Sequence, residues 1–486
     1  MDIIKVGLDF GTHQTKICIK TYPNEDYNHP IFEFFKFKDL EGNDTYFLPS
    51  IVQINKDDTL SYGFLDITNR KESEFDEKPR KTKQENQEDI NFDIAKKAAR
   101  LYCQYATQKN TYDDIDVLVK MLSIYKEQKQ KEGALDVYSQ DKDLDIPTDS
   151  QFLFRYFKQA TFSERKWSHK ISSEVISVWF LSYVIFLLEE KYGTHFSINM
   201  GIPVGEKSYK EKREFATAVL VSAYHLVEDV YHNDLENFLN EKVDNLLKKT
   251  TLSLFSEDDK EDFEIQIYPE AFAGLTTLTS LGKLSNGMSL ITDIGGGTTD
   301  ISFFTIIDNK PVIYRYWSIP QGLNYIAEKS GFTYKKGLIK QCAIQEVIQE
   351  FVKNEKIIIA QLIDDLIRHW TKETHKDKGR LLNALNNRII VYNGGGSIEE
   401  DLVQKLHYFN DIKLVDANMW KETNLKERSK VVPLCQLLTT AYGLSIGESD
   451  IDEVKVSKFT TLFNHIGADI NEEDTEEIEF TDKDKC

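Results

Sequence analysis

The chain has 486 residues, and its 60 Lys and Arg against 80 Asp and Glu give a formal net charge of −20. This balance argues against a nucleic-acid or anionic-membrane partner, because both are recognised through clustered cationic side chains. The hydrophobic fraction of 41% is sufficient for folded cores. The length favours about three domains.

The cysteines and the first residues predict a cytoplasmic location. The five cysteines are scattered and form no Cys-x-x-Cys pair, which argues against a disulfide framework or a cysteine zinc site. The N-terminus lacks the features of a signal peptide. The longest apolar run, Val175–Leu188, is shorter than the ~20 residues that span a bilayer, so we expect no membrane partner.

The N-terminal part alternates strand patterns with turns. The predicted strands are Ile3–Leu8, Lys16–Lys20, Ile31–Lys38 and Phe47–Ile54. Residues 71–90 change character because 12 of 20 are charged, which indicates a solvated segment rather than core. Residues 91–165 are highly charged with a mainly helical pattern, and we interpret 55–165 as an insertion.

From Ile171 onward, helical and strand patterns alternate again. The predicted elements are a helix over 171–192, the strands Phe196–Gly201, Met288–Asp293, Asp300–Ile307 and Arg388–Tyr392, helices through 320–386, and a last helix near 433–446. These elements predict an α/β fold. Residues 448–486 are predicted to be an acidic C-terminal tail, since 469–486 alone hold nine acids and two lysines, a net charge of −7.

One segment occurs twice. Residues Asp9–Ile17 align without gaps on Asp293–Ile301, sharing Asp, an apolar residue, Gly, then Thr and Ile at the same spacing. An apolar strand precedes each Asp and another follows each Thr, which predicts two β-hairpins with Gly and Thr at the tip. The alternative interpretation, two ordinary turns, is weak for paired copies with Asp and Thr in register.

The residue types of these hairpins suit a metal-bound polyphosphate. Gly permits close backbone approach to a ligand, and successive N–H groups at such a turn bind phosphate oxygens. Asp at the strand end can hold Mg²⁺ directly or through water. Two such hairpins predict a cleft that holds a polyphosphate from both sides.

Two further segments fit the same cleft. Asn393–Ser397 is a Gly-rich turn between a predicted strand and a helix, where a helix N-terminus can face a ligand. Glu270 follows Pro269 in the first turn of a predicted helix. Its carboxylate either stabilises the helix start or points into the cleft and orients a water molecule.

In this order, these segments resemble the superfamily of actin and the seventy-kilodalton heat-shock chaperone ATPases. Asp9–Lys16 and Asp293–Asp300 resemble its two phosphate motifs, Pro269-Glu270-Ala271 its connecting motif, Asn393–Ser397 its adenosine motif, and Ala441-Tyr442-Gly443 its closing helix. The nearest resemblance is to a chaperone-like nucleotide-binding domain without the peptide-binding domain. It implies two duplicated ribonuclease-H-like lobes around a nucleotide cleft: lobe I from 1–285 and 434–447, lobe II from 286–433.

The resemblance also implies roles for individual residues. Glu270, Asp293 and Asp9 would be catalytic, with Asp9 and Asp293 at a Mg²⁺ ion. ATP or ADP would be held by Gly11, Thr12, His13, Gln14, Gly295, Gly296, Gly297, Thr298, Gly394, Gly395, Gly396 and Ser397. For His13, a role as a turn residue at the hairpin tip is favoured over contact with the terminal phosphate. Glu399, Glu400 and Asp401 stand where chaperones have an adenine-stacking Arg and a Pro, and no residue is assigned as the chaperones' catalytic lysine.

Three functions remain open on this basis. The first is a slow Mg-dependent ATPase that couples cleft closure to an unidentified protein partner, as in chaperones. The second is a self-associating, actin-like filament. The third, a small-molecule kinase, requires a carboxylate base for an acceptor hydroxyl, and the sequence indicates none. No nucleic-acid partner is expected, and the choice between ATP and GTP stays open.

Overall fold

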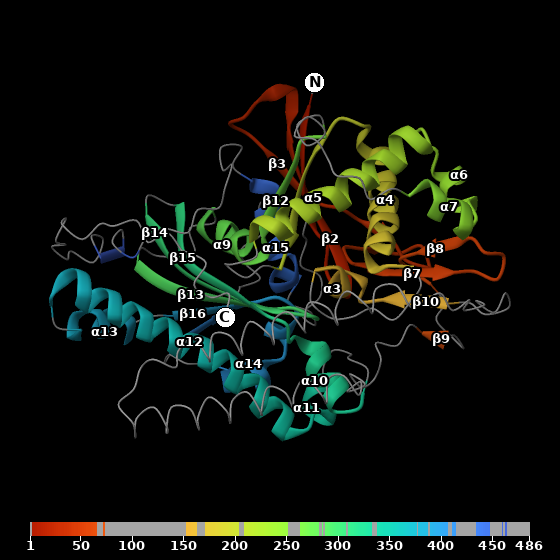
Figure 1. The fold of residues 1–486 in the computed structure, drawn as a ribbon. Coiled ribbons are helices and arrows are strands. Elements are labelled where there is room, and N and C mark those ends of the chain that lie inside the picture. Colours follow the sequence, from red (N-terminus) through yellow and green to blue (C-terminus); the bar gives the residue numbers. More distant parts are fainter. Residues whose placement is uncertain are drawn as a thin grey trace, which may run out of the picture. The chain divides into compact units, whose positions relative to one another are not determined.

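A computed structural model gives the fold of the chain (Figure 1). It describes residues 2–65, 71–72, 152–162, 171–203, 209–250, 263–280, 284, 287–307, 310–332, 338–376, 378–386, 389–406, 411–414, 434–447, 459 and 462–463. By its contacts the chain divides into one unit, 1–73 with 151–486, and a second, 74–150. Most of the predicted insertion therefore lies outside the described residues.

The first large sheet is built around the N-terminal strand. Its order is β12 (Ile265–Pro269), β11 (Ser197–Ile202), β1 (Ile3–Asp9), β2 (Gln14–Tyr22) and β3 (Ile31–Phe34), with β6 (Leu48–Pro49) also paired to β2. The β1–β2 and β2–β3 pairs are antiparallel, whereas β1–β11 and β11–β12 are parallel. The predicted first hairpin is confirmed, because β1 ends at Asp9 and β2 returns beside it.

The second large sheet has the same order and the same strand directions. Taken from the parallel edge, as for the first sheet, it runs β17 (Asp411–Leu414), β16 (Ile389–Asn393), β13 (Gly287–Ile294), β14 (Thr299–Ile307) and β15 (Lys310–Ile319). The β13–β14 and β14–β15 pairs are antiparallel, and the β13–β16 and β16–β17 pairs are parallel. The second predicted hairpin is therefore also present, and the fold is of the mixed α/β class.

Two helices lie between the central strands of the two sheets. α9 (Glu270–Ser280) and α15 (Leu434–Ile446) contact each other, α15 contacts β1 and β16, and α9 contacts β13 and β11. Their backbones approach closely: a Cβ atom on Gly443 would lie 1.8 Å from the carbonyl oxygen of Ala273. The Thr277 hydroxyl of α9 donates to the Thr439 carbonyl of α15 at 2.6 Å.

A third, small sheet differs from the expectation for its part of the chain. Its order is β8 (Leu60–Tyr62), β7 (Ile51–Ile54), β10 (Phe152–Arg155) and β9 (Lys71–Glu72). A mainly helical pattern was expected through 165, but Phe152–Arg155 is a strand, and the short helix α3 (Phe157–Phe162) follows it with every residue buried. The apolar residues of this stretch complete the first core, so it is part of the folded body.

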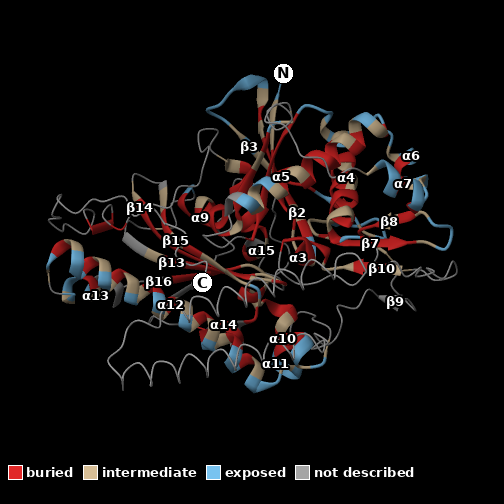
Figure 2. Cartoon of the chain, viewed as in Figure 1, coloured by how far each residue is buried: buried red, intermediate tan, exposed pale blue. Residues whose placement is uncertain are grey.

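The remaining elements cover the sheets. They are α4 (Ser173–Tyr192), α5 (Tyr209–His225), α6 (Leu235–Asn240), α7 (Val243–Lys249), α10 (Leu323–Lys329), α11 (Leu338–Cys342), α12 (Gln345–Thr374), α13 (Gly379–Asn386) and α14 (Glu400–Leu406), with the short strands β4 (Phe37–Lys38) and β5 (Asp44–Thr45). Buried residues concentrate on the sheets and the faces turned toward them (Figure 2). Among the described helices, none is long and apolar enough to cross a membrane.

The acidic tail predicted from residue 448 includes three residues that pack in the folded body. Phe459, Leu462 and Phe463 are buried in the second core. The Phe463 ring stands edge-on to Trp370 of α12, with centroids 5.2 Å apart. These aromatic and aliphatic side chains therefore belong to the folded body, and the most acidic stretch, 469–486, lies beyond them in the sequence.

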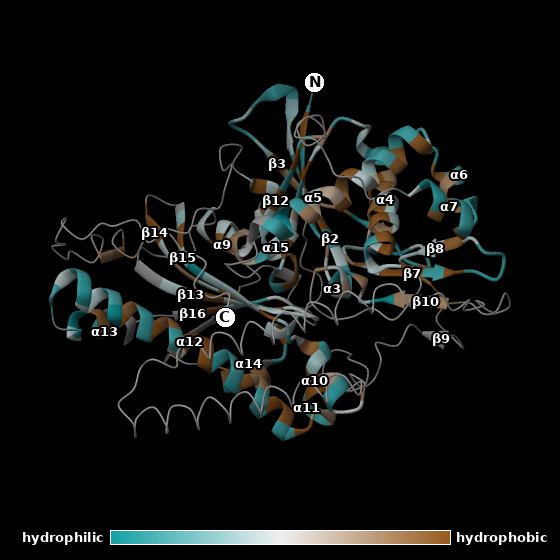
Figure 3. Ribbon diagram, in the orientation of Figure 1, coloured by the Kyte–Doolittle hydropathy of each residue, from teal (hydrophilic) through white to brown (hydrophobic). Residues whose placement is uncertain are grey.

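The long helix α12 runs beside the second sheet and alternates hydrophobic and hydrophilic residues along its length (Figure 3). On its buried face lies one acid, Glu355, only 1% exposed. Its Oε1 accepts hydrogen bonds from the Thr292 hydroxyl at 3.2 Å and the Tyr392 hydroxyl at 3.3 Å. Burial raises the pKa of Glu355 to about 8, so the folded chain holds a neutral carboxyl here near neutral pH.

Replacing Glu355 with Gln should flatten the pH dependence of stability. In the unfolded chain this carboxyl ionises near 4.5, whereas the folded chain keeps its proton up to about pH 8. Raising the pH across that window should therefore lower the unfolding free energy of the wild type relative to Glu355→Gln, by at most ~1.4 kcal/mol per pH unit. Urea titrations at several pH values measure this. The exposed Glu346→Gln on the same helix serves as control, and parallel curves for Glu355→Gln and wild type would refute the assignment.

Candidate functional site

The first hairpin carries a carboxylate that is neutralised within the hairpin. Asp9 and Lys16 are register partners on β1 and β2, and their side chains form an ion pair with Nζ 2.7 Å from Oδ2. Both side chains are largely buried. At the tip, the Ser50 hydroxyl donates to the Gly11 carbonyl at 2.7 Å and lies 3.0 Å from the Thr15 hydroxyl. The hairpin is therefore tied to the strand ends beside it.

The second hairpin has the same geometry but the opposite charge at the partner position. Asp293 pairs in register with Asp300, where the first hairpin has Lys16. The backbone N–H of Gly295 donates to the Thr298 carbonyl at 2.8 Å, and the Thr298 hydroxyl donates to Asp300 Oδ2 at 3.0 Å. Burial, together with the charge of Glu270, raises the pKa of Asp300 well above its usual range.

Asp293 is held by groups from two other elements. Its Oδ2 accepts from Asn393 Nδ2 of β16 at 2.9 Å and from the Thr440 hydroxyl of α15 at 3.2 Å. Gly394 has a φ of 77°, and a Cβ there would lie 2.1 Å from Asp293 Oδ1. Only glycine suits this position, both for its left-handed conformation and for the space it leaves the carboxylate.

Carboxylates from both sheets influence one another at this point. The pKa of Asp293 is raised to about 7, chiefly by burial, then by the charge of Glu270, then by that of Asp9. Glu270 begins α9 directly after β12. The predicted catalytic residues Asp9, Asp293 and Glu270 are therefore brought into one electrostatic site.

A buried lysine that the sequence did not single out completes this site. Lys158 of α3 forms an ion pair with Glu270 Oε1, and its side chain is only 4% exposed. Burial alone would lower the pKa of Lys158, but the charges of Glu270 and Asp9 outweigh it and raise that pKa. Its ammonium also lies over the Phe10 ring, 5.9 Å from the centroid. The available signal was the apolar run around Phe157 in an otherwise charged stretch.

The two hairpin tips are in direct contact in this structure. His13 Nε2 lies 2.5 Å from Asn324 Oδ1, and a Cβ on Gly296 would lie 2.3 Å from the His13 ring. Gln159 Nε2 donates to the Gly297 carbonyl at 3.2 Å. Burial lowers the pKa of His13 to about 4, so the imidazole is neutral at pH 7. His13 thus bridges the two hairpins.

The backbone of the second tip leaves donors for an anion. The carbonyls of Gly295 and Gly296 accept from the N–H groups of Leu323 and Asn324, at 3.0 and 2.9 Å, at the start of α10. Among the described residues, the N–H groups of Gly296 and Gly297 have no hydrogen-bond partner. Two successive unpaired N–H groups at a glycine turn suit a phosphate oxygen.

The other predicted ligand residues are placed less uniformly. Gly394, Gly395 and Gly396 follow β16 beside Asp293, but the Ser397 hydroxyl is buried and donates to the Gly394 carbonyl at 2.7 Å, so it serves the turn. Thr12 lines a small cavity with Arg155 and Tyr156, and Gln14 is exposed at the start of β2. Both therefore lie in the first hairpin, Thr12 in its turn and Gln14 at the start of its second strand.

The donor set fits a Mg²⁺ ion that arrives with a phosphate ligand. Within the part of the chain described, no three His, Cys, Asp or Glu side chains converge as a metal cage. Mg²⁺ in phosphoryl-transfer sites usually has one or two carboxylate ligands and completes its shell with water and phosphate. Asp293, buried and with a raised pKa near Asp9, is suited to such a cation.

No protein-family model matches the sequence, and no curated protein is found to be similar to it.

Lys158→Met should destabilise the fold strongly. It would leave the Glu270 carboxylate mostly buried without its cation, which costs about 3–5 kcal/mol for pairs of this kind. The double variant Lys158→Met/Glu270→Gln should recover most of that loss, and a double-mutant cycle by chemical denaturation gives the coupling. The exposed pair Lys191–Glu33 is the matched control, with coupling below about 1 kcal/mol. Equal coupling in the two cycles would contradict this account of the site.

Proposed function

We propose that this chain is a Mg-dependent ATPase that hydrolyses slowly and acts as a molecular switch. On this proposal the two large sheets are duplicated ribonuclease-H-like lobes, lobe I from 1–285 with 434–447 and lobe II from 286–433, around a nucleotide cleft. The shared strand order and directions support it, since each sheet places a hairpin and a strand-end aspartate at the same position. The proposed switch involves no nucleic-acid or membrane partner.

One observation carries the proposal. Asp9 is the last residue of β1 and Asp293 the last but one of β13, the equivalent central strands of two separate sheets, yet Asp9 contributes to raising the pKa of Asp293. Carboxylates concentrated without enough cations are costly unless a further positive charge joins them. When bound, Mg²⁺ would supply that charge and neutralise phosphate oxygens.

The residues then have distinct roles toward a nucleoside triphosphate. The N–H groups of Gly296 and Gly297 would bind phosphate oxygens. Lys158 would hold Glu270 in place through Oε1, leaving the second oxygen of that carboxylate to accept a hydrogen from the attacking water. Positioning and electrostatic stabilisation of this kind account for most catalysis of phosphoryl transfer.

The switch would act through α9 and α15. These helices contact both sheets and each other, and Thr440 of α15 donates to Asp293. A ligand that binds one arrangement of the lobes better shifts the population toward it. We propose that nucleotide binding and hydrolysis change the lobe arrangement in this way, and that a protein partner responds to it.

The proposal predicts that the purified chain releases phosphate slowly from ATP with Mg²⁺. Asp293→Asn and Glu270→Gln should each lower that rate by at least about a hundredfold, in line with the loss of a positioned acid–base or charge-stabilising group. A phosphate-release assay measures the rate, and thermal stabilisation by ATP or GTP reports binding and preference.

Glu33→Gln, which changes a partly exposed acid of β3, is the control for these variants and should keep the wild-type rate. Unchanged turnover in folded Asp293→Asn and Glu270→Gln would refute the proposed site. ATP-dependent sedimentation of the chain would favour the alternative of an actin-like filament, which uses the same nucleotide site for assembly.

His13 offers a separate test of the cleft. If a triphosphate must part the hairpin tips, His13→Ala removes the hydrogen bond to Asn324 that opposes it, worth about 1 kcal/mol. The Kd for ATP with Mg²⁺ should then fall by about fivefold, as measured by calorimetry, whereas the exposed His29→Ala should leave it unchanged. A rise in Kd would instead make His13 a phosphate ligand.

A further inference from the structure

One groove in the described structure is lined by apolar and basic residues, whereas the chain as a whole is acidic. Its lining comes from one length of α12 and from α14, and its volume is about 660 Å³. The lining residues are Gln345, Ile348, Gln349, Val352, Lys353, Lys356, Ile357, Ala360 and Lys405. None of them is acidic, although the chain has a net charge of −20.

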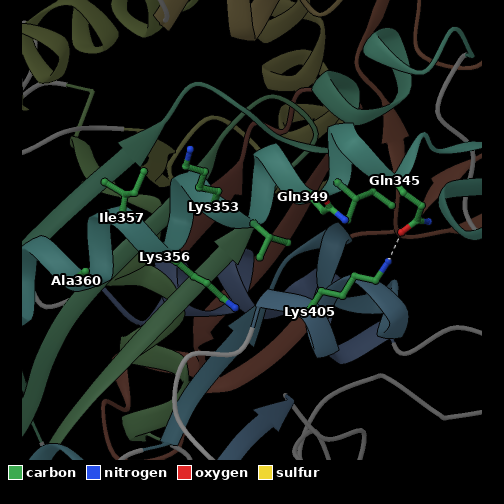
Figure 4. Close-up of a pocket in the computed structure, with 9 residues that line it drawn as sticks. Gln345, Gln349, Lys353, Lys356, Ile357, Ala360 and Lys405 are labelled. Carbon is green, nitrogen blue, oxygen red and sulfur yellow. Dashed lines mark hydrogen bonds between the residues drawn. The ribbon is translucent and has the colours of Figure 1, made fainter.

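The groove combines an apolar strip with three lysines. Ile357 is 43% exposed within it, and Lys353 and Lys356 project to opposite sides of α12 (Figure 4). Lys405 donates to the Gln345 side chain at 2.8 Å. Among the described residues, no carboxylate forms an ion pair with Lys353, Lys356 or Lys405. A segment that is both acidic and partly apolar would complement this surface.

We propose that the acidic C-terminal segment of this same chain, residues 469–486, binds in the α12 groove. Its nine acids and two lysines give it a net charge of −7, and Ile478 and Phe480 stand among glutamates, as Glu476-Glu477-Ile478-Glu479-Phe480. It can therefore supply carboxylates to the lysines and apolar side chains to the strip. Residues 415–433, which also adjoin this region in sequence, hold four cations and three anions and lack that complementarity.

The residues that precede the acidic segment in the sequence pack on α12 itself. Phe459 packs on His369 and Phe463 on Trp370, both in the C-terminal half of α12. From Trp370 back to Lys356 is 14 residues of helix, about 21 Å. The 15 residues from Phe463 to Ile478 reach up to about 50 Å when extended. The segment can therefore lie along the groove without any movement of its anchor.

The two ends of this path carry cysteines that allow a direct test. Cys342 is exposed at the end of α11, just before α12 begins, and Cys486 is in the acidic segment. A segment running along α12 toward its N-terminus brings Cys486 near Cys342. Brief oxidation of the full chain with diamide, followed by proteolysis and mass spectrometry, should show an intramolecular Cys342–Cys486 disulfide. Because the attraction is electrostatic, its yield should fall as salt is raised.

Charge-reversal variants test whether the groove lysines bind the acidic segment. Lys353→Glu/Lys356→Glu should lower the yield by about tenfold, as expected for two contacts of modest strength. Adding Glu476→Lys/Glu477→Lys should restore it. The exposed Lys372→Glu, on the same helix outside the groove, should leave it unchanged.

Three outcomes would overturn the inference: no such disulfide, a yield indifferent to the groove charges, or only intermolecular disulfides whose yield rises with concentration. The last would assign the groove to the segment of a second copy. The test uses no nucleotide, so its result is independent of the proposed ATPase activity.

Discussion

The close packing of α15 against β1 and α9 is the constraint on which the rest of the structure depends. A Cβ on Gly7 would lie 2.2 Å from the carbonyl oxygen of Ala441, and Gly443 leaves even less room beside Ala273. With side chains at these points the helices could not sit between the two sheets at this distance. Because they do, Thr440 reaches Asp293 and Glu270 begins its helix beside the same carboxylate. The close packing that these glycines permit thus fixes the positions of the polar groups in the site.

In that geometry the carboxylates of the site are not equally neutralised. Lys16 neutralises Asp9 and Lys158 neutralises Glu270. Within the described part of the chain, Asp293 forms no ion pair and accepts hydrogen bonds from an amide and a hydroxyl, and burial, with the charges of Glu270 and Asp9, raises its pKa to about 7. Carboxylates in this condition gain most from an incoming cation. The charge requirement lies on the second sheet, where two successive glycine N–H groups also lack partners within the described residues.

The parts of the fold that follow local patterns were predictable. Ile3–Leu8 was expected as a strand and β1 covers Ile3–Asp9, and the helix over 171–192 is α4, Ser173–Tyr192. Alternation and apolar runs report which side of a segment is buried, and that is a local property. No local pattern predicts the role of Lys158, because its partner Glu270 is 112 residues away. His13 and Asn324, 311 residues apart, and the burial of Phe463 on α12 are likewise tertiary contacts that no local period encodes.

The two hairpins have the same backbone arrangement but differ in charge, so the two sides of the site are not equivalent. The register partner of the strand-end aspartate is Lys16 in the first hairpin and Asp300 in the second. If both hairpins carried lysine, each aspartate would already be neutralised and neither would need a cation. If both carried aspartate, the buried negative charge would be still harder to offset. One neutralised and one uncompensated hairpin suit an ion that is held mainly from one side, with its other positions left for water and a phosphate. On the proposed function, the asymmetry of this single register position would leave the second hairpin able to bind and release a cation with its ligand, whereas two neutralised hairpins would form only a structural ion-pair network.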